Sequence, residues 1–326
     1  MRIRKLLRVR FVVDPFTEQE KIMAELTPMM QKYMETKEQY KDCILFYRLG
    51  DFYEMFFDDA LVASKELEIT LTGKSCGLEE RAPMCGIPYH AVEGYLSKLV
   101  SRGYKVAICE QVEDPKLAKG LVKREVIRVV TPGTNLNVQS LEAGKNNYLL
   151  SIAYTPDGIG ISAADVTTGD YYVTEVEDLK KLNDELMKYE PSEIICNEAF
   201  LVSGFDVNDL KSRLHISVNA LESHMFDDDG CRRILMKHFK VNTLIGLGVE
   251  EFPTGLLAAG ALLQYLYDTQ KTDLEHFTHI YPYLTSKYML LDSSTRRNLE
   301  LTETLREKQK RGSLLWVLDK TKTAMG

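Results

Sequence analysis

Apolar positions along residues 23–133 change spacing several times, which predicts helices mixed with strands. Met, Tyr and Leu recur at helical spacing over 23–41, where Thr27 is placed to cap a helix that begins at Pro28. The apolar run 43–49 predicts a buried strand, which Gly50 and Asp51 end. The patterns that follow predict a helix over 56–69, a short strand over 69–73, a Pro/Gly-rich turn feeding an amphipathic helix over 82–103, and strands over 104–112 and 124–133. Together they predict a small α/β domain.

A second α/β unit of about 150 residues follows a polar, linker-like stretch that begins at "TPGT", 131–134. Its first part, 148–176, carries three strand patterns joined by turn sequences around Asp157 and Gly169. Next come a helix over 177–190, a strand over 192–197 and helices over 230–239 and 255–270. The end changes character, with a helix within 288–308 capped at Ser293 or Ser294 and another apolar helix starting in 312–326. Because these last apolar faces lack partners in the sequence, we expect the chain to be the front portion of a longer protein.

Composition fits a globular protein, with 44% hydrophobic and 27% charged residues. No apolar run approaches the ~18 residues that span a bilayer. The six cysteines show no CxxC spacing and lie mostly in apolar contexts, which predicts reduced core thiols in a cytoplasmic protein. Residues 1–20 form a basic extension without the small-residue cleavage site of a secretory signal.

The net charge of −7 argues by itself against a nucleic-acid binder, but its distribution matters. Residues 1–131 carry a net charge of +1, and residues 132–326 carry −8. Five cations and one acid lie within 116–130, a pattern that suits either a solvated face or contact with phosphates. Any contact with a polyanion is therefore expected in the first domain.

Enzymatic chemistry finds little support, and we predict no catalytic residue, no metal site and no cofactor site in this chain. Gly73-Lys74-Ser75 resembles the end of a phosphate-binding loop, but Glu68 stands where the first glycine is required. Asp165 lies on a predicted strand of the second unit, where a Mg²⁺-dependent nuclease would need several converging carboxylates. No partners for Asp165 are evident, and this nuclease is kept as the alternative from another functional class.

The stretch "LGDFYEMF", 49–56, places two aromatics and an acid directly after a tight turn. In an extended strand, Phe52 and Glu54 point to one side and Tyr53 to the other, inward side. One interpretation makes Phe52 a core residue and Glu54 a rim acid. The other makes them a displayed pair, in which a planar aromatic wedges into a base stack at a weakened base pair.

Several long phrases resemble one known family. They are "TPMMQKYMETKEQYKDCILFYRLGDFYEMFFDDA", "PMCGIPYHAVEGYLSKLVSRGYKVAICEQVEDP", "VIRVVTPGT", "GLLAAGALLQYLYDTQ" and "LDSSTRRNLELTETLR". Together they resemble, in order, the N-terminal part of the bacterial MutS family of DNA mismatch-repair sensors. The resemblance runs from about residue 26 to the end of the chain.

The resemblance implies a mixed α/β fold in three parts. Residues 21–131 would be a small mixed-sheet mismatch-binding domain, residues 132–282 a ribonuclease-H-like, non-catalytic connector domain, and residues 283–326 the start of an all-helical core/lever region. In the family's Phe-X-Glu motif, the Phe stacks on a mispaired base and the Glu hydrogen-bonds to it. These positions are Phe52 and Glu54 here.

The cations Lys74, Arg81 and Arg128 are predicted to contact the DNA backbone, because they lie around the probe or on a nearby strand of the near-neutral domain. The resemblance also implies that ATP, Mg²⁺ and the ATPase domain belong to parts of the full-length protein beyond residue 326, so this chain is not expected to be an enzyme. The implied partners are double-stranded DNA with mismatches or small loops, a second subunit of a homodimer and a MutL-type repair protein. The implied location is the bacterial cytoplasm, at the nucleoid. The remaining alternative is an interaction-only fragment, or a paralogue that keeps the motif but has lost DNA binding.

Overall fold

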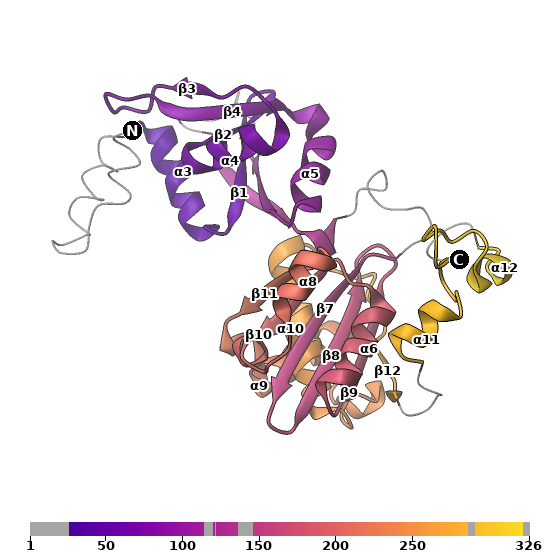
Figure 1. Cartoon of the computed structure of the whole chain (residues 1–326). Coiled ribbons are helices and arrows are strands. Elements are labelled where there is room, and N and C mark those ends of the chain that lie inside the picture. Colours follow the sequence, from indigo (N-terminus) through magenta and orange to yellow (C-terminus); the bar gives the residue numbers. More distant parts are fainter. Residues whose placement is uncertain (1–25, 114–119, 121, 136–145, 286–290, 322–326) are drawn as a thin grey trace. The chain divides into compact units, whose positions relative to one another are not determined.

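A computed structural model describes residues 26–113, 120, 122–135, 146–285 and 291–321. Contacts between residues divide the chain into two compact units, one formed by Met1–Leu99 and Lys105–Arg128, the other by Val100–Tyr104 and Val129–Gly326. Figure 1 shows helices and a sheet in each unit, so the predicted mixed α/β fold class is confirmed. The predicted basic extension and the polar linker lie largely outside the described residues.

The first unit contains a six-stranded sheet with the strand order β3-β4-β2-β1-β5-β6. Its elements are α3 Pro28–Gln39, β1 Cys43–Leu49, β2 Phe52–Phe56, α4 Phe57–Leu67, β3 Thr72–Lys74, β4 Ala82–Pro88, the 3-10 turn η1 Tyr89–Ala91, α5 Val92–Ser101, β5 Lys105–Gln111 and β6 Arg124–Val130. Strand β2 is antiparallel to both β1 and β4, whereas β1 and β5 are parallel.

The local predictions for the first helix and strands are confirmed, with one error. Helix α3 begins at Pro28 with Thr27 at the N-cap position, although the Thr27 side chain makes no capping hydrogen bond, and β1 covers the predicted range. The stretch predicted as a Pro/Gly-rich turn is instead strand β4, which pairs with β3 on one side and β2 on the other. Its prolines, Pro83 and Pro88, lie near the two ends of the strand, where a missing N–H disturbs the ladder least.

The second unit is a sheet with the strand order β11-β10-β7-β8-β9-β12. Its strands are β7 Tyr148–Thr155, β8 Gly158–Asp165, β9 Asp170–Val176, β10 Glu193–Asn197, β11 Ser217–Leu221 and β12 Tyr281–Pro282. Strands β7, β8 and β9 form the antiparallel meander predicted from the turn sequences, and β10 joins β7 in parallel. The other elements are η2 Pro132–Thr134, α6 Leu179–Tyr189, α7 Glu198–Leu201, α8 Val207–Arg213, η3 Ser223–Phe226, α9 Asp228–Phe239, η4 Ile245–Leu247, α10 Pro253–Gln270, α11 Ser293–Asn298 and α12 Leu314–Leu318.

Two apolar cores lie on the two faces of this second sheet. Helix α10 packs on one face together with α9, and α6 and α8 cover the other (Figure 1). Successive β7 residues point to opposite faces and so belong to different cores, as Leu149 and Leu150 illustrate. Gly160 on β8 permits the closest approach of α10, since a Cβ atom there would lie 2.0 Å from the Thr254 carbonyl oxygen.

Helix α11 is shorter than predicted and has a different cap. Asp292 caps it, accepting a hydrogen bond from Thr295 N at 2.6 Å, so the predicted cap at Ser293 or Ser294 is wrong. The aspartate carboxylate is already suitable for the capping role one position earlier. The helix ends before Glu300, which has a left-handed φ of +48°.

All six cysteines are buried and unpaired, as predicted: Cys43, Cys76, Cys85, Cys109, Cys196 and Cys231. Among the described residues, no helix is both long and apolar enough to cross a bilayer.

Candidate nucleic-acid interface

The stretch that carries Phe52 is a tight hairpin between β1 and β2. Leu49 pairs with Phe52, and Gly50 takes a left-handed φ of +58°, which glycine adopts without a Cβ clash. Arg48 Nε donates to the Gly50 carbonyl oxygen at 2.5 Å, and Tyr89 N donates to the Asp51 carbonyl oxygen at 3.0 Å. The turn that presents Phe52 is therefore held from β1 and from η1, which follows β4.

Exposure alternates along β2 as predicted for a strand. Tyr53 and Met55 are buried on one face, while Phe52, Glu54 and Phe56 share the other. On that second face, the Tyr33 ring of α3 packs edge-on against Phe56, with ring centroids 4.9 Å apart. Exposure then rises from 1% at Phe56 to 47% at Phe52. The core interpretation of Phe52 is therefore wrong, because this residue lies at the surface.

A polar cluster on the inner face supports the hairpin. The Tyr53 hydroxyl donates to Glu110 Oε1, and Arg48 Nη1 lies 3.2 Å from the same oxygen. The Arg48 guanidinium also lies 3.8 Å from the centre of the Tyr89 ring. Burial, and then the bond to Glu110, raise the pKa of Tyr53 well above its usual value, so its hydroxyl stays protonated and donating. Sequence reasoning missed this cluster, because Arg48 and Glu110 meet only through the parallel pairing of β1 with β5.

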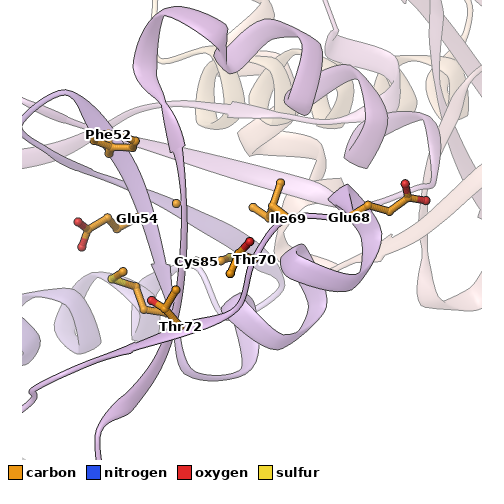
Figure 2. Close-up of a pocket in the computed structure, with 9 residues that line it drawn as sticks. Phe52, Glu54, Glu68, Ile69, Thr70, Thr72 and Cys85 are labelled. Carbon is orange, nitrogen blue, oxygen red and sulfur yellow. The ribbon is translucent and has the colours of Figure 1, made fainter.

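Beside Phe52 and Glu54 lies an open hollow of about 560 Å³ (Figure 2). Phe52 and Glu54 lie on one side of it, and Ile69 and Thr70 lie across from them. The remaining lining residues are Glu68, Thr72, Met84, Cys85 and Gly86. The exposed ring thus stands at the edge of a concave surface.

The structure brings one of the three predicted cations, Lys74, into contact with Glu54. Lys74 Nζ lies 2.6 Å from Glu54 Oε2, and the exposed Arg81 directly precedes Ala82, the β4 partner of Lys74. Arg128 lies elsewhere, on the opposite edge strand β6. There it is half-buried, and burial lowers the pKa of its guanidinium while the Glu93 charge opposes this.

Among the residues that the structure describes, Asp165 belongs to no cluster of possible metal ligands. It is fully buried, and its Oδ2 accepts a hydrogen bond from Asn147 N at 3.0 Å. Its Oδ1 accepts from the Thr167 amide and hydroxyl at 2.7 and 2.6 Å. In the described part of the chain, no three His, Cys, Asp or Glu side chains gather as metal ligands. Asp165 fixes the β8–β9 turn, and the nuclease alternative is not favoured.

Comparison with known proteins gives one consistent answer. Residues 27–139 match the family model MutS domain I, residues 147–278 match MutS domain II, and residues 294–326 match MutS domain III. Three similar curated proteins, each named DNA mismatch repair protein MutS, come from Lachnoclostridium phytofermentans, Ruminiclostridium cellulolyticum and Acetivibrio thermocellus. They are 70%, 54% and 54% identical over 93% of this chain, and the aligned regions cover 33%, 35% and 35% of their own lengths. The chain therefore spans about a third of these relatives.

Proposed function

Since the chain belongs to the MutS family of DNA mismatch repair proteins and comprises the N-terminal region of that family, we propose that its first unit recognises mispaired or unpaired bases in DNA. In this proposal Phe52 inserts into the base stack and Glu54 contacts the base that the insertion displaces. The observation that carries it is the exposure of Phe52, 47%, on a face where Phe56 is 1% exposed.

The energetics of insertion select for weak base pairs. Wedging an aromatic side chain between bases costs a few kcal/mol of unstacking, and a mismatched pair lowers that cost. The rigid turn around Gly50 limits the entropy that the ring loses on insertion, because its backbone is already ordered. Discrimination would then depend on deformability and not on base sequence.

The negative charge of Glu54 fits a penalty on ordinary duplex. A carboxylate close to phosphates is repelled, and a hydrogen bond to a base at a kinked lesion would offset this repulsion. Glu54→Gln removes the charge and is therefore expected to reduce discrimination by strengthening binding to matched DNA. Unchanged discrimination in this variant would refute the charge argument while leaving the wedge intact.

Contacts to the DNA backbone would supply affinity that does not depend on sequence. We propose Arg81 for this role because it is exposed beside the β3–β4 edge, and Arg128 as a more distant contact on β6. Lys74 was predicted to have the same role, but its side chain contacts Glu54. ATP and Mg²⁺ chemistry, the homodimer, the MutL-type partner and a cytoplasmic location at the nucleoid are proposed for the full-length protein.

The test is a titration of labelled DNA. Because the chain spans about a third of its relatives, it is tested in a chimera in which it replaces the corresponding region of the Lachnoclostridium phytofermentans protein. The ligands are a duplex with one G·T pair or one unpaired T, and its fully matched counterpart. Phe52→Ala is expected to weaken binding to the duplex with the G·T pair or unpaired T about 5- to 150-fold, because one base–aromatic stack is lost. Ile127→Ala, which removes a similarly exposed apolar side chain from β6, should leave it unchanged.

Two outcomes contradict the proposal in different ways. Equal affinity of the unaltered chimera for both duplexes would refute mismatch recognition and favour a paralogue without DNA discrimination. Discrimination that survives Phe52→Ala would refute the role of this ring only.

A further inference from the structure

Lys74 reaches Glu54 from two strands away. In the order β3-β4-β2, Lys74 pairs with Ala82, whereas Glu54 pairs with Gly86, farther along β4. The lysine side chain therefore crosses the sheet face diagonally, and its Nζ lies 5.5 Å from the centre of the Phe56 ring. The contact between Lys74 and Glu54 therefore joins two strands that are not adjacent in the sheet.

The ion pair engages only one oxygen of the carboxylate. Lys74 Nζ donates to Glu54 Oε2 at 2.6 Å. Within the residues that the structure describes, no hydrogen bond is made to Glu54 Oε1. The glutamate side chain is 18% exposed and the lysine side chain 35%, so the pair is partly shielded from water. Glu54 is thus held by one oxygen while the second remains able to accept a hydrogen bond.

We infer that Lys74 is a positioning residue for Glu54 and sets mismatch discrimination through it, an inference that rests on the proposed function. The ammonium group fixes the carboxylate in the orientation that presents Oε1 beside Phe52. A lysine that contacts phosphate would not orient Glu54, and phosphate contacts are indifferent to the base pair.

The two roles give different results in the same titration. A positioning role means that Lys74→Met lowers the ratio of heteroduplex to homoduplex affinity, by about 3- to 10-fold for two side chains in direct contact. In a Glu54→Ala background the same replacement should change the ratio less than about 2-fold, because nothing remains to position. Lys74→Arg keeps a cation within reach of Oε2 and should restore most of the ratio.

A phosphate contact predicts another pattern. Lys74→Met would weaken binding to both duplexes equally and reduce the slope of log affinity against log salt by about 1, with or without Glu54. That pattern, or an unchanged ratio, would overturn the inference. Lys65→Met removes one exposed cation from α4 and controls for net charge.

The measurements use the chimera described above, with circular dichroism confirming that each variant is folded. If the unaltered chimera does not discriminate between the duplexes, the proposed function itself fails. If it discriminates and Phe52→Ala abolishes this, but Lys74→Met does not alter the ratio, only the inference about Lys74 fails.

Discussion

Replacing Glu193 should destabilise the second unit strongly, because its buried carboxylate joins three segments that are distant in sequence. Glu193 begins β10 and has no exposed surface. Its Oε2 accepts from Gly133 N at 3.0 Å, and its Oε1 accepts from Asn219 Nδ2 at 3.0 Å and the Tyr265 hydroxyl at 2.8 Å. The first of these bonds holds the "TPGT" segment against β10, where even a Cβ on Gly133 would lie 3.1 Å from Glu193 Cβ.

The magnitude follows from the donors left behind. In Glu193→Ala the Gly133 amide and the Tyr265 hydroxyl lose their acceptor in a buried site, at about 1–3 kcal/mol each, whereas the half-exposed Asn219 can turn to water. The expected loss is about 2–6 kcal/mol, a large part of the about 5–15 kcal/mol that stabilises a typical domain. Glu193→Gln keeps one acceptor oxygen and should lose about 1–3 kcal/mol, since one remaining contact becomes donor against donor.

The assay is urea unfolding followed by far-ultraviolet circular dichroism. Glu177→Ala is the control, because this carboxylate is 85% exposed and pairs with Lys181 of α6 at the surface. It should change the free energy of unfolding by at most about 0.5 kcal/mol. A loss below about 1 kcal/mol for Glu193→Ala, or equal losses for the Ala and Gln variants, would refute the reasoning.

Three further replacements test other parts of the second unit. Gly160→Ala should cost about 1–3 kcal/mol in urea unfolding, since its Cβ would meet the Thr254 carbonyl oxygen; an unchanged midpoint would show that α10 does not approach β8 this closely. Burial lowers the pKa of His276, and His238 adds to this, so the folded state favours the neutral ring. That contribution to stability is complete above about pH 6.5 and is lost as pH falls through the folded pKa. The melting temperature of His276→Gln should therefore fall less between pH 8 and pH 5 than that of the unaltered chain. Asp165→Asn should lower the free energy of unfolding by about 1–3 kcal/mol without altering duplex discrimination, whereas a nuclease centre would show Mg²⁺-dependent cleavage that this change abolishes.

Local features of the fold could be predicted from the sequence because they depend on neighbouring residues. Pro28 starts α3, and Gly50 with Asp51 ends β1. Strand alternation alone placed Tyr53 inside and Phe52 and Glu54 together on the other face. The roles of Phe52 and Glu54 in recognition came from the family resemblance and remain predictions.

Features that depend on strand order could not be predicted in the same way. Lys74 and Arg128 looked equivalent as cations of one domain, but β3 places Lys74 on Glu54 whereas β6 places Arg128 at the opposite edge of the sheet. The pairing of β4 with both β2 and β3 likewise overrides the turn propensity of its prolines and glycine. Asp165 has a strand position that would suit catalysis, and only its hydrogen bonds reveal its structural role.

The interior position of the thiols makes the molecule suitable for site-directed labelling. Burial raises the pKa of Cys43, Cys85, Cys109, Cys196 and Cys231 to about 12, and Cys76 has no exposed surface. Since the thiolate is the nucleophile, these sulfurs should react slowly with maleimides at neutral pH. A cysteine introduced in place of the exposed Arg81, directly before β4, should therefore accept a fluorophore selectively and report the arrival of DNA at the β3–β4 edge of the sheet.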